Sequence, residues 1–375
     1  MSKQEITQAK ILTHFSKCND PRTRPIHYPL IEIILLVVLS TVCGEEGWEA
    51  FEEWGKDKLS FLRTFLPFEN GIPCPDTIRR VMERLNPEEF LNAFISWATD
   101  LNERVSGQLC IDGKALRGSS KKKSSLHIVT AWSEANRIVL GSVTVPSKSN
   151  EIPATEELLN LLILKEGDVI TMDAMGCQRS IVSAIRKQKA DYLIALKKNQ
   201  RNLSDEVENY FNQVLEAPEY ALCSDCVLEK QGHGRQDRQE VWISRDIEWL
   251  PQKSDWKGLQ SLILVCRNWE EKGKKCSEKR YYISSLTDTS PEDFAKMIRR
   301  HWSIENELHW HLDVTFNEDA SQIGAAANEN LRVARMIGLD MLRSEKSNKR
   351  GLKAKSRRCH RSDDYLKKVL LVANF

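Results

Sequence analysis

The spacing of hydrophobic and polar residues changes near residue 106 and divides the chain into a helical first part and a mixed second part. The longest apolar run of the first part is Leu30–Cys43, with the sequence LIEIILLVVLSTVC. We expect a buried helix there, because the run contains Glu32 and is shorter than the roughly 20 residues that cross a membrane. Helical spacing continues over residues 48–66, 76–85 and 86–103.

The helix predicted at residues 76–85 follows the turn ENGIPCP and carries three arginines. We expect Asp76 to be its N-cap, because an oxygen of the capping side chain accepts a hydrogen bond from a backbone N–H in the first turn. A helix-turn-helix DNA-binding unit and an ordinary helical bundle both fit this pattern, because neither has a sharp sequence fingerprint.

From Gln108 onward, short apolar runs rich in β-branched residues replace the helical spacing. The spacing predicts, in order, strands at 109–111, 125–133 and 138–145, a helix at 151–164, a strand at 168–172, a helix at 178–189, a strand at 192–196 and a helix from about 203. This order predicts a mixed sheet with helices packed on it, as in the RNase H-like fold. In that fold the first and fourth strands are neighbours.

Residues 218–285 alternate apolar and polar positions, which predicts a second small sheet inserted into the predicted RNase H-like core. His233, Arg235 and Trp242 lie in this insertion. Aromatic and cationic side chains on strands can stack on bases and neutralise phosphates. Tryptophans that only pack the sheet fit the same pattern.

After the insertion, the stretch HWSIENELHWHLDVTFNED carries a polar or acidic residue at every fourth position, namely His301, Glu305, His309 and Asp313. Such spacing places these side chains along one face of a helix. A solvated charged face is one interpretation. The apolar residues between them favour another, in which the stripe is half buried.

Two further carboxylates come at the ends of apolar strands, Asp112 after Leu109–Ile111 and Asp173 after residues 168–172. The predicted fold brings them to neighbouring positions, where Glu305 could join them from a helix. Carboxylate oxygens are the ligands that Mg²⁺ prefers. Taken singly, Asp112 fits a turn, Asp173 fits a helix cap and Glu305 fits a solvated face. Together they predict a site for Mg²⁺, with Mn²⁺ able to substitute.

Composition adds little about the fold but indicates the number of domains and the cellular compartment. The chain has 375 residues, 41% hydrophobic and 29% charged, which is typical of a folded protein of two or three domains. The net charge is only +2, but residues 343–368 carry eleven Lys or Arg and three acids. That segment suits phosphate binding or a solubilising tail. Ten cysteines without paired spacing and an N-terminus without an apolar signal core predict a protein of the reducing cytoplasm.

Several motif blocks occur in a fixed order along the chain: IDGKALRG, TMDAMGCQ, ALKKNQ, GHGR and HWSIENELHWHLDVTFNED. These blocks resemble those of DDE transposases, specifically the ISAs-type insertion-sequence family that includes the H-repeat-associated proteins linked to Rhs elements. HYPLIEIILLVVLSTVCGEEGWE and ENGIPCPDTIRRV resemble the domain that precedes the catalytic part in this family. The resemblance covers nearly the whole chain.

The resemblance implies roles for individual residues. It makes Asp112, Asp173 and Glu305 the catalytic residues and the metal ligands. The expected DNA-binding residues outside the three acids are Lys114, Arg117, Asn199 and Gln200 from the matched motif blocks, and His233, Arg235 and Trp242 from the inserted strands. Lys114 and Arg117 are expected to approach the DNA backbone, and Asn199 and Gln200 to position the substrate.

The chain departs from related transposases at three positions around the glutamate. Those proteins often carry Tyr, Arg and Lys where this sequence has Ile298, His301 and Leu312. The contacts that this signature makes with the DNA end are therefore expected from other residues. His301, His309 and Asp313 are the candidates.

The expected fold class is α/β, with an RNase H-like mixed-sheet core, an inserted β-rich subdomain and a preceding α-helical domain. The predicted segments are a helical DNA-end-binding domain at 1–105, the first part of the core at 106–217, the insertion at 218–290, core helices with the catalytic glutamate at 291–342 and a basic tail at 343–375.

The expected function is that of an insertion-sequence transposase. It would bind the terminal inverted repeats of its element, cut the DNA in a Mg²⁺-dependent reaction and join the ends to target DNA. A homodimer is expected when two ends are held together, and no membrane partner is expected. Two alternatives stay open, a nuclease of the same fold without strand transfer and an inactive DNA-binding protein derived from a transposase.

Overall fold

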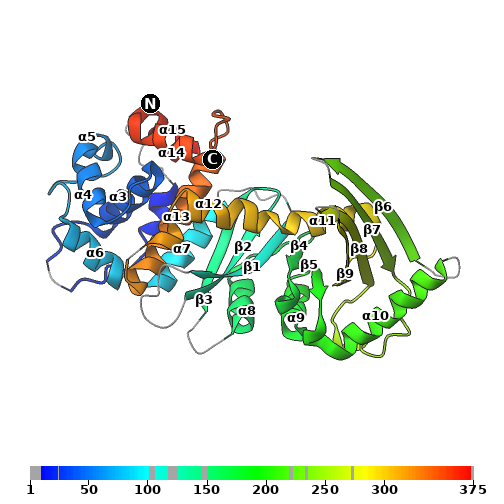
Figure 1. The fold of residues 1–375 in the computed structure, drawn as a ribbon. Helices are drawn as coiled ribbons and strands as arrows, with labels where there is room; N and C mark the ends of the chain where they lie inside the picture. Colours follow the sequence, from blue (N-terminus) through cyan, green and yellow to red (C-terminus); the bar gives the residue numbers. More distant parts are fainter. Residues whose placement is uncertain are drawn as a thin grey trace.

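The computed structural model describes residues 10–23, 25–100, 106–116, 126–145, 150–218, 223–232, 235–271, 274–321 and 323–372. A helical bundle lies at one end of the molecule and a β-rich part at the other, with the central strands between them (Figure 1). One long helical segment, from α11 to α12, crosses the molecule between the two ends. Among the described helices, the first, α2 (Lys10–Phe15), and the last, α15 (Asp363–Val372), both belong to the bundle.

The bundle is built from both ends of the chain. Its helices are α2 (Lys10–Phe15), α3 (Leu30–Cys43), α4 (Trp48–Asp57), α5 (Leu59–Leu62), α6 (Pro75–Arg84), α7 (Pro87–Asp100), α13 (Ala325–Ser344), α14 (Leu352–Arg361) and α15 (Asp363–Val372). α3 matches the predicted apolar helix and is buried along nearly its whole length. It ends where Gly44 takes a left-handed conformation with φ of 89°. No helix among the described residues is both long enough and apolar enough to span a bilayer.

Glu32 is a buried carboxylate inside α3. It accepts a hydrogen bond of 2.7 Å from the backbone N–H of Phe68, and burial raises the pKa of Glu32. The acid therefore has a structural partner, which explains how an otherwise apolar core helix accommodates it.

The cap predicted for α6 is wrong. Cys74 occupies the N-cap position without a side-chain cap, Pro75 starts the helix and Asp76 lies in the first turn. Proline is favoured at the first helical position because its missing N–H would have no partner there. Asp76 instead pairs with Arg79 at 3.0 Å.

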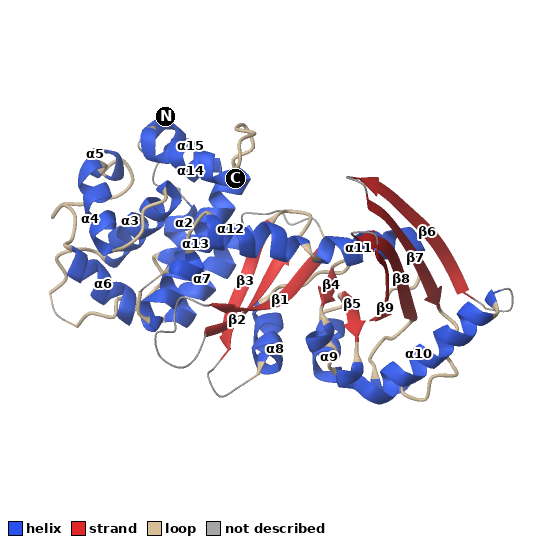
Figure 2. Ribbon diagram, in the orientation of Figure 1, coloured by secondary structure: helices blue, strands red, loops and turns tan. Residues whose placement is uncertain are grey.

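One sheet of nine strands forms the rest of the molecule (Figure 2). Its order is β3-β2-β1-β4-β5-β9-β8-β7-β6. The strands are β1 (Gln108–Leu116), β2 (Leu126–Ser133), β3 (Ile138–Val145), β4 (Val169–Met172), β5 (Asp191–Leu196), β6 (Cys223–Gly232), β7 (Arg235–Ser244), β8 (Ser261–Glu271) and β9 (Lys274–Ser284). β1 pairs with β4 in parallel, which confirms the prediction that the first and fourth strands are adjacent.

The inserted strands extend this sheet and do not form a separate one, contrary to the prediction from sequence. β9 pairs antiparallel with β5, with Leu193 opposite Ser284 and Leu196 opposite Tyr281. Polar alternation in the insertion gave no sign of this pairing, because an edge strand leaves its backbone hydrogen bonds open to any partner.

Helices cover both faces of the sheet. α8 (Glu151–Leu161), α9 (Arg179–Lys187) and α10 (Arg201–Glu216) share one apolar core with strands from both halves of the sheet. α11 (Pro291–His301) packs on the opposite face, where Phe294 and Ile298 meet Leu193 and Tyr282. α11 continues through a π-helical turn, Ile304–His309, into α12 (Trp310–Val314).

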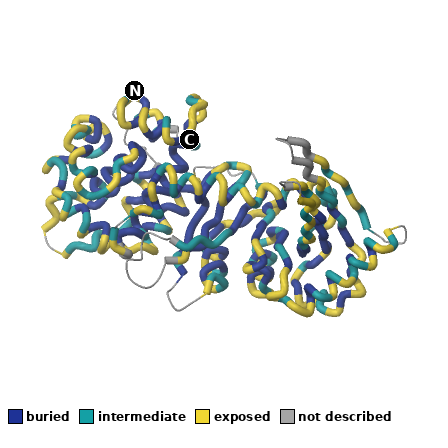
Figure 3. Tube along the Cα trace, viewed as in Figure 1, coloured by how far each residue is buried: buried dark blue, intermediate teal, exposed yellow. Residues whose placement is uncertain are grey.

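The predicted basic tail consists of two packed helices. Burial is continuous from the bundle into the central strands (Figure 3). Leu366 and Val369 of α15 belong to the same apolar core as Ile33 of α3 and Leu308 of the π-turn. The segment boundaries proposed from sequence stay predictions, but this core joins helices from both ends of the chain.

Candidate active site

Strand alternation places Asp112 and Asp173 on the same face of the sheet. In β1, Leu109 and Ile111 face the core beneath α8 and α9, whereas Cys110 faces the core of the bundle. Asp112 is two residues beyond Cys110 and therefore points to the same face as that cysteine. Asp173 likewise lies two residues beyond Thr171 and therefore points to the same face as that threonine.

The register of the two strands brings these acids to neighbouring positions. The paired residues Ile111 and Met172 immediately precede Asp112 and Asp173. The adjacency expected from the predicted fold is thus present in the structure.

The helical segment from α11 to α12 turns its polar stripe toward this face. Thr171 Oγ1 lies 3.0 Å from His301 Nδ1, and Asp112 Oδ2 lies 3.5 Å from His309 Nε2. Asp313 pairs with Lys114 of β1. The stripe therefore faces the sheet, and the half-buried interpretation is confirmed for His301, His309 and Asp313.

A cavity of about 630 Å³ opens beside this stripe. Asp112, Asp173 and Glu305 all line it, together with His301 and Thr171. The structure thus brings the three predicted acids to one pocket that opens to solvent at Asp173 and Glu305.

The pocket affects the protonation of two of its groups. Loss of surrounding water and the negative charge of Asp112 raise the pKa of Glu305, against the opposing effect of His309. Burial lowers the pKa of His301, and the nearby Asp112 and Asp173 only partly offset this. His301 is therefore neutral near pH 7 and can exchange a hydrogen bond with Thr171.

Asp173 also organises the turn that follows β4. Its Oδ1 accepts a hydrogen bond of 2.9 Å from the backbone N–H of Met175 and caps the 3₁₀ turn Ala174–Gly176. Asn199 and Gln200 lie behind this turn and donate to the backbone carbonyls of Ala174 at 2.7 Å and Cys177 at 2.9 Å. In the structure their side chains thus hold the loop that carries Asp173.

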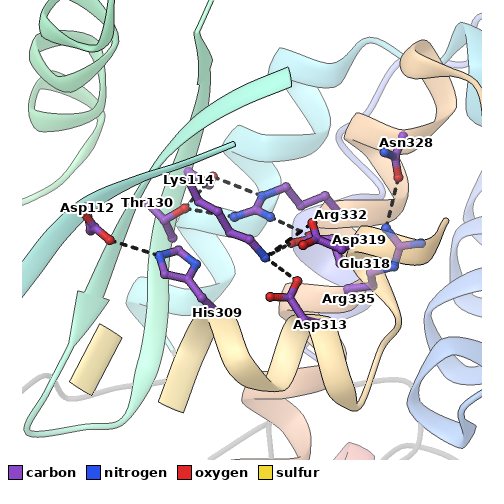
Figure 4. A network of polar contacts seen from close by, with 11 residues as sticks. Asp112, Lys114, Thr130, His309, Asp313, Glu318, Asp319, Asn328, Arg332 and Arg335 are labelled. Carbon is purple, nitrogen blue, oxygen red and sulfur yellow. Dashed lines mark hydrogen bonds and ion pairs between the residues drawn. The ribbon is translucent and has the colours of Figure 1, made fainter. Parts of the chain in front are cut away.

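Lys114 does not point toward the pocket. Its ammonium group pairs with Asp313 and lies 3.8 Å from Glu318 and 3.7 Å from Asp319 (Figure 4). Glu318 is buried and also pairs with Arg332 of α13 at 2.5 Å. Lys114 and Asp313 therefore belong to a polar network that joins β1 to the helices, and their contacts with DNA stay predictions.

Trp242 is the one remaining predicted DNA contact whose side chain the structure describes, and it does not line the pocket. Trp242 on β7 packs against the apolar core beneath α10, which is the sheet-packing alternative left open by the sequence. Arg117 and His233 lie outside the described residues, as does the side chain of Arg235.

Sequence reasoning missed several residues at this site. Lys197, Lys198 and Arg280 line the pocket, and the two lysines directly follow β5 in the block ALKKNQ. In the sequence, the signal that could have identified the two lysines was their position as a pair of cations immediately after a predicted strand. Glu151 was also missed, because only the fold brings its carboxylate against Gly113, where an added Cβ would lie 2.3 Å from Oε2.

The carboxylates supply the right ligand type for a hard divalent cation but are not drawn together. Within the described ranges, no three His, Cys, Asp or Glu side chains are grouped closely enough to hold a metal ion. Asp112 contacts His309, and Asp173 caps its own turn. The donor set fits Mg²⁺ in its chemistry and shared cavity, whereas binding would require the side chains to converge.

Comparison with known proteins agrees with this architecture. A family described as "Transposase DDE domain" matches residues 104–339, and one described as "DDE_Tnp_1-associated" matches residues 12–98. "H repeat-associated putative transposase YhhI" of Escherichia coli (strain K12) is 38% identical over 374 residues, covering 96% of this chain and 97% of the relative. "Putative transposase YncI" of Escherichia coli O157:H7 is 39% identical over 371 residues, covering 96% and 94%.

A shorter relative, "Inactive transposase YbfQ" of Escherichia coli (strain K12), is 40% identical over 76 residues, which is 20% of this chain. The family matches together extend from the first bundle helices into α13, and the full-length relatives cover almost the whole chain. The chain therefore belongs to the DDE transposase family, among the H repeat-associated proteins.

Proposed function

We propose that the protein is an active transposase, which cuts DNA at the ends of its element and joins them to target DNA. The observation that carries this proposal is the shared pocket of Asp112, Asp173 and Glu305, reached from two adjacent parallel strands and one helix. The order β3-β2-β1-β4-β5 supports an RNase H-like core within the larger sheet.

Asp112, Asp173 and Glu305 would hold divalent cations, with Mg²⁺ as the expected ion and Mn²⁺ as a substitute. Bound there, the ions would activate the attacking hydroxyl group and stabilise the leaving oxygen of a phosphodiester. The chain's own contribution is positional: the strands fix the two aspartates, and the Asn199 and Gln200 amides hold the turn after Asp173.

The cationic side of the pocket would take the substrate. Lys197, Lys198 and Arg280 also line the cavity and would contact phosphates of the bound strand. Lys198 and Arg280 would first have to leave their carboxylate partners, which are Asp205, Glu208 and Glu278. His301 is neutral and buried, so its role would be to hold Thr171 and the helix, and not to neutralise phosphate. Two DNA ends held together would require at least a dimer.

The test is cleavage and joining of a labelled duplex that carries the inverted repeat flanking the gene, in Mg²⁺. Asp173→Asn and Glu305→Gln should each slow cleavage by roughly a hundredfold or more, because loss of even an outer partner of a metal ligand costs up to about that much. Glu292→Gln is the matched control, since Glu292 is an exposed acid of α11 outside the pocket.

The outcomes separate the three functions. Cutting and joining by the unaltered protein, with loss in both pocket variants but not in the control, supports the transposase. Cutting without joining would favour a nuclease. Tight binding without any cutting in Mg²⁺ or Mn²⁺ would favour an inactive DNA-binding protein derived from a transposase. One relative, YbfQ, carries the name "Inactive transposase".

A further inference from the structure

A second cavity, of about 790 Å³, lies between α12 and the segment that includes α14. Trp310 and Val314 form part of one wall. No Asp or Glu lines this cavity, whereas five basic residues do: Arg350, Lys353, Arg357, Arg358 and Arg361. We call it the α12–α14 groove. Its lining is cationic without a compensating acid, unlike that of the pocket beside Glu305.

The basic residues of α14 form a regular stripe. Lys353, Arg357 and Arg361 are four residues apart and exposed, so they share the outer face of the helix. The opposite face is buried through Leu352 and Cys359. The helix is therefore anchored by its apolar side and holds its cations in fixed places, which a flexible solubilising tail would not do.

No described carboxylate neutralises these three cations. Across the ranges that the structure describes, no ion pair or side-chain hydrogen bond is recorded for Lys353, Arg357 or Arg361. Neighbouring α14 residues do have partners, since His360 pairs with Glu45 at 2.8 Å and Lys355 lies 3.9 Å from Glu345. Like charges at this spacing repel one another, so the stripe costs stability unless an anion binds it.

The groove lies close to the candidate active site along one helical segment. Trp310 and Val314 follow Glu305 by five and nine residues, which is roughly 8 to 14 Å of helix. His309 and Asp313 of the same segment face the sheet, whereas Trp310 and Val314 are 50% and 40% exposed on the groove side. A duplex with one phosphodiester in the pocket would thus continue past the groove.

We propose that the α12–α14 groove binds the sugar–phosphate backbone of the DNA duplex that flanks the cleavage point. This inference rests on the proposed function, because it takes the DNA at the pocket as the polyanion. Contacts of Lys and Arg with phosphates position a duplex without reading its sequence. The groove therefore contributes affinity and placement, and not recognition of the terminal repeat.

The experiment measures binding of the full-length protein to a fluorescent duplex of arbitrary sequence over a range of salt concentrations. The groove variant combines Lys353→Gln, Arg357→Gln and Arg361→Gln. The control combines Lys165→Gln, Lys187→Gln and Lys257→Gln, which removes the same charge from exposed positions remote from the groove. Thermal unfolding of both variants checks that the exposed substitutions leave the fold intact.

Each lost phosphate contact reduces the slope of log K against log salt by about 0.9 for duplex DNA. We expect the groove variant to lose roughly two to three from this slope and to bind at least about tenfold more weakly at moderate salt. The control should retain the slope of the unaltered protein. Equal losses in both triple variants, or none in the groove variant, would overturn the proposal.

A second measurement locates the contacts on the DNA. Neutral methylphosphonates replace one phosphate at a time in a duplex that carries the element end. Substitutions beside the cleavage point should weaken the unaltered protein several-fold but have little further effect on the groove variant, as expected for a lost direct contact. Identical methylphosphonate profiles for the two proteins would refute the proposal that the α12–α14 groove contacts these phosphates.

The failures of the two proposals can be told apart. If the unaltered protein binds the duplex but never cuts it, the catalytic proposal fails. The comparison of salt-dependence slopes between the unaltered protein and the groove variant still tests the groove proposal. If it cuts the duplex and the groove variant binds with an unchanged slope, only the groove proposal fails. If the unaltered protein does not bind duplex DNA at any salt concentration, both are overturned.

Discussion

Lys114 lies two residues after Asp112 on the same strand face, yet its charge is directed into the protein. Burial raises the pKa of Asp313, although the Lys114 ammonium opposes this. Burial also opposes ionisation of Glu318, but Arg332, Arg335 and Lys114 together hold the pKa of Glu318 below its ordinary range. The network stays charged because each carboxylate has a cation beside it.

Removing this lysine should affect stability more than DNA binding. In Lys114→Met, the facing carboxylates lose their ammonium partner, which should reduce the free energy of unfolding by about 2 to 4 kcal/mol. Urea unfolding measures the loss, and the double variant with Asp313→Asn should recover part of it because the charges are balanced again. A stable Lys114→Met protein with a shallower salt dependence of DNA binding would instead support the DNA contact expected from sequence.

Single residues at the site were predictable where strand or helix periodicity decided their direction. Asp112, Asp173 and Glu305 line one pocket because alternation and strand order place them there. The destinations of Lys114 and Asn199 were not predictable, because each depends on a partner distant in sequence. The position of Glu151 beside Gly113 was not predictable for the same reason.

At the scale of elements, the π-turn Ile304–His309 decides whether the polar stripe stays on one face. A regular helix turns about 100° per residue, so His301 and Asp313 would end about 120° apart around its axis. Bonds from residue i to i+5 wind the chain less per residue and reduce this drift. The sequence showed the spacing of four, but the π-turn lets His301, His309 and Asp313 all contact the sheet, while Glu305 lines the pocket at its solvent-exposed side.

Deleting Asn306, an exposed residue of the π-turn, should convert the turn to a regular helix. A π-turn holds one residue more than the regular helix that would replace it, so the residues before and after the deletion would keep their relative direction. His309 and Asp313 would stay at Asp112 and Lys114, so we expect a melting temperature close to that of the unaltered protein. DNA cleavage should fall, because Glu305 lies inside the turn and would shift. Asn306→Ala keeps the chain length and should cut like the unaltered protein; equal activity of the deletion would show that the π-turn is dispensable.

The segment after α13 is tied to the C-terminal helices by Glu345. Its buried carboxylate accepts hydrogen bonds from Tyr365 at 2.7 Å and from the backbone of Ser347 at 3.0 Å. Burial by itself would raise the pKa of Glu345, but the bonds from Ser347, Tyr365 and the backbone lower it to about 2. The folded protein therefore favours the ionised form.

This shift makes a specific contribution to the pH dependence of stability. Because the folded pKa lies below the ordinary value of 4.5, the stabilisation is full above about pH 4.5 and is lost as the pH falls toward 2. Glu345→Gln should be less stable by about 2 to 3 kcal/mol at pH 6, with the difference shrinking steadily in acid. Urea unfolding at several pH values measures it; a constant difference would contradict the assigned pKa.

Long elements with a clear period were predicted nearly to the residue, as Leu30–Cys43 and Ile138–Val145 show. The joining of the inserted strands to the core sheet was not predicted. Pairing of β9 with β5 joins strands about 90 residues apart, and no local pattern specifies such a partner. Sequence periodicity therefore gave the strands of the insertion but not their place.

At the scale of the whole molecule, that pairing gives the insertion a structural purpose. α11 packs on the inserted strands β7 and β9, and α12 joins the core of the helical bundle. The helical segment that carries Glu305 is thus anchored at both ends of the molecule (Figure 1). The position of the Glu305 carboxylate, proposed to be catalytic, depends on packing in two regions far from it.

The C-terminal residues complete the same core, which predicts the effect of removing them. Truncation after Glu345 would expose apolar surface that Leu352, Leu366 and Val369 cover. Burying one such side chain contributes about 1.5 to 3 kcal/mol, and folded proteins are stable by only about 5 to 15 kcal/mol in total. The truncated chain should therefore aggregate or lose its cooperative unfolding transition, whereas the groove variant, altered only at exposed positions of α14, should unfold like the unaltered protein. A truncated chain that stays folded and loses only DNA affinity would instead support the basic tail that the sequence predicts at residues 343–375.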